Sequence, residues 1–227
     1  MARSKESKVR YAVIGLGDIV QEAVLPGFHH CDHSRVVAFV SGDPEKHRAL
    51  GARYGVSLHY HYNQLEECLA GNDIDAVYIG LPNHLHREYA VRCAAGKKHV
   101  LCEKPMAVNA SECRDMIDAA RANKVKLMIA YRLHFEEGNL EAIRLAQSGE
   151  IGEPRYFSSA FSQQVRDGNV RLAYGSEEGG GPVFDMGVYC INAARYLFRE
   201  EPVEISAMTA NDGEPRFART EEMATIA

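Results

Sequence analysis

A carboxylate and an ammonium group stand side by side at Glu103 and Lys104, between a short apolar run and Pro105. The run from His99 to Cys102 is typical of a buried strand. Because the residue before a proline avoids the helical conformation, we expect Lys104 to be extended where the strand ends. Ligands of open parallel sheets bind at the carboxyl ends of the strands, where a lysine can donate a hydrogen bond or tune a neighbour's pKa. The alternative is a surface ion pair ahead of a helix.

A second candidate site is a glycine turn that follows the apolar strand from Arg10 to Ile14. Strand, glycine turn and helix, in that order, form the context of a dinucleotide-binding loop. The first glycine permits the tight turn, and the second lets main-chain N–H groups approach a pyrophosphate at the helix N-terminus. Val20 stands where the fingerprint has its third glycine, so a plain turn between strand and helix is the alternative. The loop residues that we assign to the cofactor are Gly15, Leu16, Gly17, Asp18 and Ile19.

The next strand, from Val36 to Val40, ends in Ser41 and Gly42 rather than in the acidic residue usual at an NAD-selective site. Asp43 precedes Pro44, so it is better explained as the N-cap of a helix. Ser41, Lys46 and Arg48 offer donors and positive charge that suit a 2′-phosphate. This pattern favours NADP over NAD, with a solvated helix face as the alternative for the two basic residues.

Further apolar runs alternate with helical patterns up to residue 131, giving six strands in all. Such alternation predicts a doubly wound parallel sheet with right-handed crossovers, hence an α/β Rossmann domain over residues 1–131. Another strand ends in Leu81-Pro82-Asn83, whose backbone and amide are placed to line the cofactor.

Residues 132–227 have a different sequence pattern and form a second predicted domain, which we expect to be α+β. A helix from Glu136 to Ser148 and a strand from Pro154 to Phe161 precede the triple glycine 179–181. Asp185 and Tyr189 are four residues apart, so on a helix they share one face and could serve proton transfer. The alternative, which spacing alone favours, is that Tyr189 packs in the core and Asp185 caps the helix.

The overall composition excludes several classes of protein. The chain has 227 residues, of which 46% are hydrophobic, and a net charge of -5. This net negative charge does not favour binding to nucleic acid. Its apolar runs fall short of the ~20 residues of a membrane span, and its polar start does not resemble a secretory signal, so we expect a cytoplasmic protein. The scattered cysteines and histidines predict reduced thiols and no metal site.

In order along the chain, these stretches resemble the Gfo/Idh/MocA oxidoreductases, and within them the glucose–fructose oxidoreductase branch. The matching motifs cover nearly the whole chain after residue 9. They are Tyr11 to Gly17, Val40-Ser41-Gly42, Leu81-Pro82-Asn83 with His86, Gly96 to Met106, Ala130-Tyr131-Arg132, Gly179 to Gly181 with Asp185 and Tyr189, and Glu201 to Glu204.

The resemblance implies a Rossmann domain followed by a domain with an open, mainly antiparallel sheet. It also implies NADP, and reversible hydride transfer between the nicotinamide and a sugar carbon. In this mechanism Tyr189 takes the hydroxyl proton, Lys104 stabilises the oxyanion, and Asp185 orients the substrate. A phenol with a pKa of ~10 is a poor base at neutral pH, and an adjacent ammonium would lower that pKa. Further contacts with cofactor or substrate are expected from His86, Glu103, Lys104, Arg132 and Arg171.

The resemblance leaves the substrate and the state of the chain open. We expect a small sugar as substrate and a homo-oligomer formed through the C-terminal sheet. The family's second domain needs more strands after residue 227, so the chain is expected to be a fragment or a truncated relative. The alternatives are a dinucleotide-binding regulator without catalysis and a dehydrogenase of non-sugar dihydrodiols.

Overall fold

The computed structural model describes residues 8–227, which divide into two compact units with the boundary between Ile129 and Ala130. The boundary predicted from the sequence lies two residues further along the chain. Nearly all of the polar start, on which the expectation of a cytoplasmic protein rests, lies outside the described residues. In the described part of the chain, no helix is long and apolar enough to cross a bilayer.

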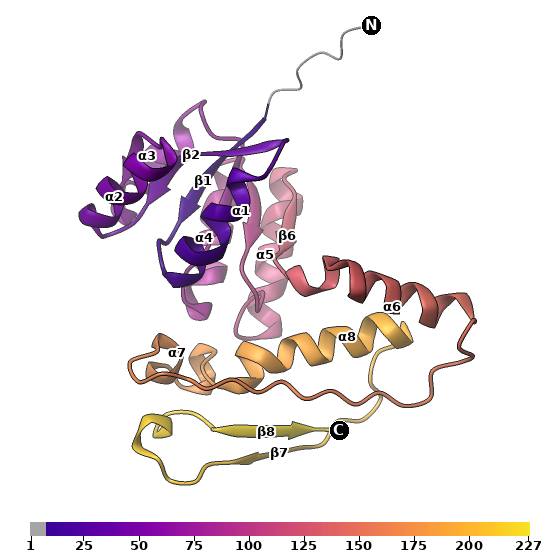
Figure 1. Cartoon of the computed structure of the whole chain (residues 1–227). Helices are drawn as coiled ribbons and strands as arrows, with labels where there is room; N and C mark the ends of the chain where they lie inside the picture. Colours follow the sequence, from indigo (N-terminus) through magenta and orange to yellow (C-terminus); the bar gives the residue numbers. More distant parts are fainter. Residues whose placement is uncertain (1–7) are drawn as a thin grey trace, which may run out of the picture. The chain divides into compact units, whose positions relative to one another are not determined.

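The first unit is built on a six-stranded parallel sheet with strand order β3-β2-β1-β4-β5-β6 (Figure 1). This order is that of a dinucleotide-binding fold, and it reverses direction between β1 and β4. The predicted doubly wound sheet is therefore confirmed. The strands are β1 (Val9–Ile14), β2 (Ser34–Val40), β3 (Leu58–Tyr60), β4 (Ala76–Ile79), β5 (His99–Cys102) and β6 (Leu127–Ile129).

The sheet is buried on both faces because successive side chains of a strand point to opposite sides. Ala12 and Ile14 of β1 belong to one core cluster, and Val13 between them belongs to the other. The first cluster includes side chains from α3, α4 and α5, and the second includes side chains from α1 and α2. Helices thus cover both faces of the sheet.

The sequence predicts helix caps at Asp43 and at Asn109 or Ser111, and the structure has caps at Asp43 and Asn109. Asp43 accepts hydrogen bonds from the main chain of Glu45 and Lys46, and Asn109 caps α5 through Glu112. The sequence predicts that Pro26 and Gly27 bend or end the first helix; in the structure Pro26 lies in the first turn of α1, where a missing N–H costs nothing, and the helix continues to His29. The helical segments are η1 (Val20–Val24), α1 (Leu25–His29), α2 (Pro44–Tyr54), η2 (Tyr62–Gln64), α3 (Leu65–Ala70), η3 (Asn83–Leu85), α4 (His86–Ala95) and α5 (Ala110–Asn123).

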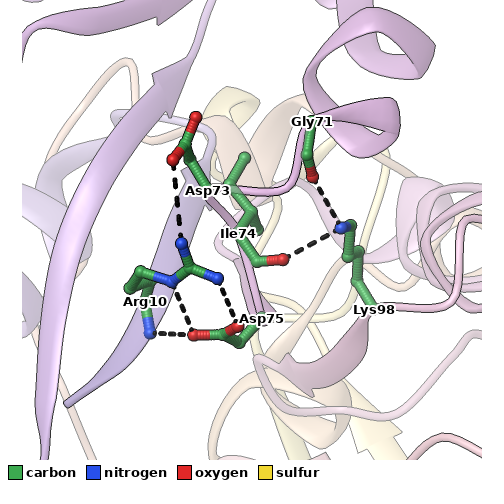
Figure 2. Close-up of polar contacts among 6 residues, drawn as sticks. All are labelled: Arg10, Gly71, Asp73, Ile74, Asp75 and Lys98. Atoms are coloured by element: carbon green, nitrogen blue, oxygen red, sulfur yellow. Dashed lines mark hydrogen bonds and ion pairs between the residues drawn. The ribbon is translucent and has the colours of Figure 1, made fainter. Parts of the chain in front are cut away.

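Charged side chains fasten the amino ends of the strands to one another (Figure 2). The guanidinium of Arg10 on β1 donates two hydrogen bonds to the Asp75 carboxylate, at 3.0 and 2.8 Å. The main-chain N–H of Arg10 donates to the same carboxylate at 2.8 Å. The Lys98 ammonium donates to the carbonyl oxygens of Gly71 and Ile74, each at 2.9 Å. These contacts fix the edge of the sheet opposite to the predicted site.

The second unit contains α6 (Glu137–Ser148) and α8 (Val188–Phe198), which lie side by side, and a hairpin of β7 (Ala207–Ala210) with β8 (Met223–Ile226). The hairpin is antiparallel, as expected for this region. Gly149 ends α6 in the left-handed conformation at φ 81°. The strand predicted from Pro154 to Phe161 is wrong: this segment runs without strand partners. The shorter elements are η4 (Arg132–Phe135), α7 (Val170–Ala173), η5 (Ser176–Glu178), η6 (Val183–Gly187) and η7 (Pro215–Phe217).

Candidate active site

The carboxyl ends of the strands form one continuous row, held by main-chain hydrogen bonds. The N–H groups of Gly15, Gly80 and Glu103 each donate across to the last residue of a neighbouring strand, at 2.9 Å. Ser41 donates in the same way to Tyr60, at 3.0 Å. The residues that follow the strands are therefore neighbours along one edge, although they are far apart in sequence.

The glycine loop lies in this row at the point where the strand order reverses. Gly15 has φ +88°, and a Cβ on it would stand 2.5 Å from the carbonyl oxygen of Gly80. Around Gly17, by contrast, a Cβ would meet no atom within 4 Å. The loop is tight on its protein side and open on its outer side, which fits a dinucleotide whose pyrophosphate approaches the main chain. The side chain of Leu16 is buried, so Leu16 can contact a cofactor only through its main chain.

The next position along the row is Ser41, at the end of β2. Ser41 is only 5% exposed, and its hydroxyl accepts from the N–H of Asp43 at 3.2 Å. Because the Asp43 carboxylate caps α2, no acidic side chain takes the place of a ribose-binding aspartate at Ser41. The helix N–H groups hold the pKa of Asp43 below its usual value, so this residue stays ionised in its cap.

On the other side of the glycine loop, Lys104 follows β5 and is only 6% exposed. The peptide bond to Pro105 is cis. Glu103 beside it accepts from the main chain of Lys104 at 3.2 Å and from the Tyr78 hydroxyl. Tyr78 was missed by sequence reasoning because it lies inside an apolar strand and has the pattern of a core residue. Because Lys104 is buried at the strand ends, it is not the surface ion pair that was the alternative, and it stays a candidate for the chemistry of the site.

His86 has a different position from the one expected of a cofactor contact. It is fully buried, and its ring nitrogens face the carbonyl oxygens of Pro105 at 2.8 Å and Leu81 at 2.9 Å. Both ring nitrogens are therefore engaged with main chain. Burial lowers the pKa of His86, against the opposing effect of these carbonyl groups. The residue joins the loop after β4 to the loop after β5, so any effect on a cofactor passes through Leu81, Pro82 and Asn83.

The remaining candidates belong to the second unit. Asp185 on η6 forms an ion pair with Arg171. Tyr189 on α8 stacks with Phe161 and meets Tyr131 edge-on, at centroid distances of 5.9 and 6.4 Å. It also lines a cavity of about 210 Å³. Arg132 is exposed and pairs with Glu136 at 2.7 Å.

Within each unit, the structure brings part of the predicted site together. The first unit places the glycine loop, Ser41, Leu81, Glu103 and Lys104 along one sheet edge. In the second unit, Asp185 and Tyr189 lie within one continuous helical segment, η6 followed by α8. The triple glycine is packed against the chain itself, since a Cβ on Gly180 would collide with the carbonyl oxygen of Tyr174.

Comparison with known proteins agrees with this fold. Residues 9–131 match the oxidoreductase family with an NAD-binding Rossmann fold, and residues 139–227 match the GFO/IDH/MocA C-terminal domain. The chain belongs to the Gfo/Idh/MocA oxidoreductase family, and the predicted resemblance is confirmed.

Three relatives illustrate the similarity. The crystal structure of aldose-aldose oxidoreductase from Caulobacter crescentus with glycerol is 37% identical, covers 96% of this chain and 66% of its own, and has a TM-score of 0.87. The D-xylose 1-dehydrogenase [NADP(+)] of Haloarcula marismortui is 32% identical over 91% of this chain and 59% of its own length. The trans-1,2-dihydrobenzene-1,2-diol dehydrogenase of Xenopus laevis is 31% identical over 83% of this chain and 55% of its own length. The chain thus spans about 60% of the length of the D-xylose dehydrogenase relative.

Proposed function

We propose that this chain carries the cofactor site and catalytic residues of an NADP-dependent oxidoreductase that oxidises or reduces a sugar or polyol carbon. The observation that carries the proposal is the buried ammonium of Lys104 on the same sheet edge as the glycine loop. The serine at the end of β2 supports NADP, as does the relative named D-xylose 1-dehydrogenase [NADP(+)]. That relative and the structure named aldose-aldose oxidoreductase support the substrate class.

The residues would divide the chemistry as follows. The nicotinamide, when bound, supplies the acceptor or donor of the hydride. Main-chain N–H groups of the loop from Gly15 to Ile19 would hold the pyrophosphate, and Leu81 to Asn83 would line the cofactor. Lys104 would hydrogen-bond the substrate oxygen and stabilise negative charge as it develops there. Glu103 and Tyr78 keep that lysine's main chain in place.

Tyr189 and Asp185 complete the proposal from the second unit. As hydride leaves the alcohol carbon, Tyr189 would accept the hydroxyl proton, and Asp185 with Arg171 would orient the substrate hydroxyls. Assembly into a homo-oligomer through the hairpin of β7 and β8, a cofactor contact from Arg132, and a cytoplasmic location remain predictions. A dihydrodiol is the second candidate substrate, because a relative with 31% identity is named as a dihydrodiol dehydrogenase.

The test is a titration of NADP and NAD into the chain, followed by an assay with aldoses, polyols and a trans-dihydrodiol. Lys104→Met keeps an unbranched side chain in the buried position and removes the charge. We expect this variant to bind NADP as the unmodified chain does and to lose about 10²-fold or more in turnover. Lys126→Met, at an exposed position before β6, is the matched control and should change neither property.

The outcomes separate the alternatives. Binding of NADP without turnover of any substrate class would favour a dinucleotide-binding regulator. Turnover that survives Lys104→Met would refute the catalytic role of the lysine. Failure to bind either dinucleotide would refute the proposal for this chain.

A further inference from the structure

The end of β3 lies beside the end of β2, and its first residue beyond the strand is a histidine. Tyr60 pairs with Val40 in the parallel register, so His61 follows β3 at the level where Ser41 follows β2. The Nε2 atom of His61 lies 3.5 Å from the place where a Cβ on Gly42 would stand. A substituent on the 2′ oxygen of a ribose held at the end of β2 would meet this ring.

The local contacts of His61 leave one ring nitrogen for a ligand. Nδ1 lies 3.0 Å from Oδ1 of Asn63, and the main-chain N–H of His61 donates to Gln64 at 3.0 Å. The His61 side chain is exposed. The Asn63 main-chain N–H also lies 3.4 Å from Nδ1, as the N-cap contact of η2. A neutral ring with its proton on Nε2 accepts this bond and can donate to a ligand, whereas a protonated ring donates from Nδ1 to Oδ1 of Asn63 and from Nε2 to a ligand. Only the protonated ring adds a positive charge, which attracts an anionic ligand.

Several other charged or titratable groups surround this position. His47 on α2 stacks on His59 at a centroid distance of 5.1 Å, and its pKa is lowered by burial and by His59 and His61. Asp43 is ionised, and its charge is directed to the main-chain N–H groups at the start of α2. The others are Lys46 in the first turn of α2, Tyr62 beside the ring, and Glu67 of α3, which is reached through Gln64. A site rich in imidazoles gains from an anion, because a phosphate offsets the repulsion between the rings.

We propose that His61 recognises the 2′-phosphate of NADP as an imidazolium, so that the preference for NADP over NAD is linked to proton uptake. The inference rests on the proposed cofactor and adds a specificity-determining residue to it. Histidine is suited to this role because its charge changes between pH 5 and 8. The expected consequence is a preference for NADP that weakens as the pH rises.

The experiment measures the dissociation constants of NADP and NAD between pH 6.5 and 8.5 by calorimetry. One imidazole that takes up a proton together with a phosphate changes the affinity ratio by about fivefold across this range. Loss of the last proton of the phosphate, near pH 6, would act in the opposite direction. Titrations at one pH in buffers of different ionisation enthalpy should show proton uptake with NADP and none with NAD.

Three variants make the test specific. His61→Asn retains a good N-cap for η2 and removes the titration, so the affinity ratio should be low and independent of pH. His61→Lys supplies a permanent charge, so the ratio should be high and independent of pH. His33→Asn, before β2 at the opposite edge of the sheet, should behave as the unmodified chain.

A flat ratio in the unmodified chain, or a dependence on pH that survives His61→Asn, would overturn the inference while the NADP site stands. A chain that binds no NADP at any pH would overturn the proposed function, and this inference with it.

Discussion

Two glycines of the same loop provide a test that separates the stability of the fold from the binding of the cofactor. Gly15 faces the protein: its φ of +88° lies in the region that favours glycine, and a Cβ would stand 2.5 Å from the Gly80 carbonyl oxygen and 2.9 Å from the Leu81 side chain. Gly17 faces outward: a Cβ on it would have no atom within 4 Å. Its φ lies outside the left-handed region, so its backbone does not require glycine. The change to alanine adds the same methyl group at both positions.

The two substitutions should differ sharply in stability. For Gly15→Ala, the left-handed conformation costs about 1–2 kcal/mol. Displacement of the Gly80 main chain, which is anchored to Ile14, adds about 1–3 kcal/mol. The total of about 2–5 kcal/mol is a large part of the stability of an ordinary domain. For Gly17→Ala we expect a change within about 0.5 kcal/mol.

Binding should show a different pattern. Urea unfolding followed by circular dichroism gives the stability of each variant, and titration with NADP gives its affinity. Because the outer side of Gly17 is where the pyrophosphate would approach, Gly17→Ala should weaken NADP binding by about tenfold or more. This variant should remain fully folded while it does so.

Either of two results would refute the reasoning. If Gly15→Ala unfolds at the same urea concentration as the unmodified chain, the tight contact with Gly80 is not present in solution. If Gly17→Ala binds NADP with unchanged affinity, the dinucleotide does not pass over this loop.

Three further predictions concern other parts of the chain. The guanidinium of Arg10 lowers the pKa of Asp75 to about 2. The ionised Asp75 therefore stabilises the folded chain above about pH 4, and this stabilisation is lost as the pH falls through about 2. Asp75→Asn should therefore cost about 1 kcal/mol at pH 7, discounted because the side chain is 39% exposed, and should flatten acid unfolding followed by circular dichroism. Alkylation followed by mass spectrometry should label the exposed Cys31 first and leave Cys68 unlabelled until the chain unfolds, because burial raises the Cys68 pKa to about 12. Tyr189→Phe keeps the ring contacts and loses the hydroxyl, so turnover should fall about 10²-fold or more at unchanged NADP affinity. Equal turnover would show that the phenol is not the base.

The Rossmann half of the chain could be predicted from sequence because its signals are local and repeated. Apolar runs alternate with helical patterns, Asp43 precedes a proline, and Asn109 or Ser111 precedes a helical pattern. Each signal corresponds to an element in the structure, with Asn109 as the cap of α5. The segment from Pro154 to Phe161 shows the limit of this reasoning. It has the aromatic composition of a strand, but a strand also needs a partner, and composition does not specify one.

The residues that surround the candidate site were harder to predict because their roles depend on register. Tyr78 belongs to an apolar run, yet its hydroxyl donates to Glu103, which is 25 positions away in the chain and directly follows the neighbouring strand. His61 was not among the candidates because its nearest sequence neighbours carry no cofactor signal. Its place beside Ser41 follows only from the pairing of β3 with β2.

His86 shows how burial changes the meaning of a motif residue. From the sequence, a histidine three residues after a Leu-Pro-Asn turn at a strand end is an apparent ligand contact. In the structure, both of its ring nitrogens face carbonyl oxygens, one from the loop after β4 and one from the loop after β5. One loop carries the residues assigned to the cofactor, and the other carries Lys104. A side chain that holds these two loops at a fixed spacing can be required at the site without touching a ligand, because the distance between cofactor and lysine depends on it.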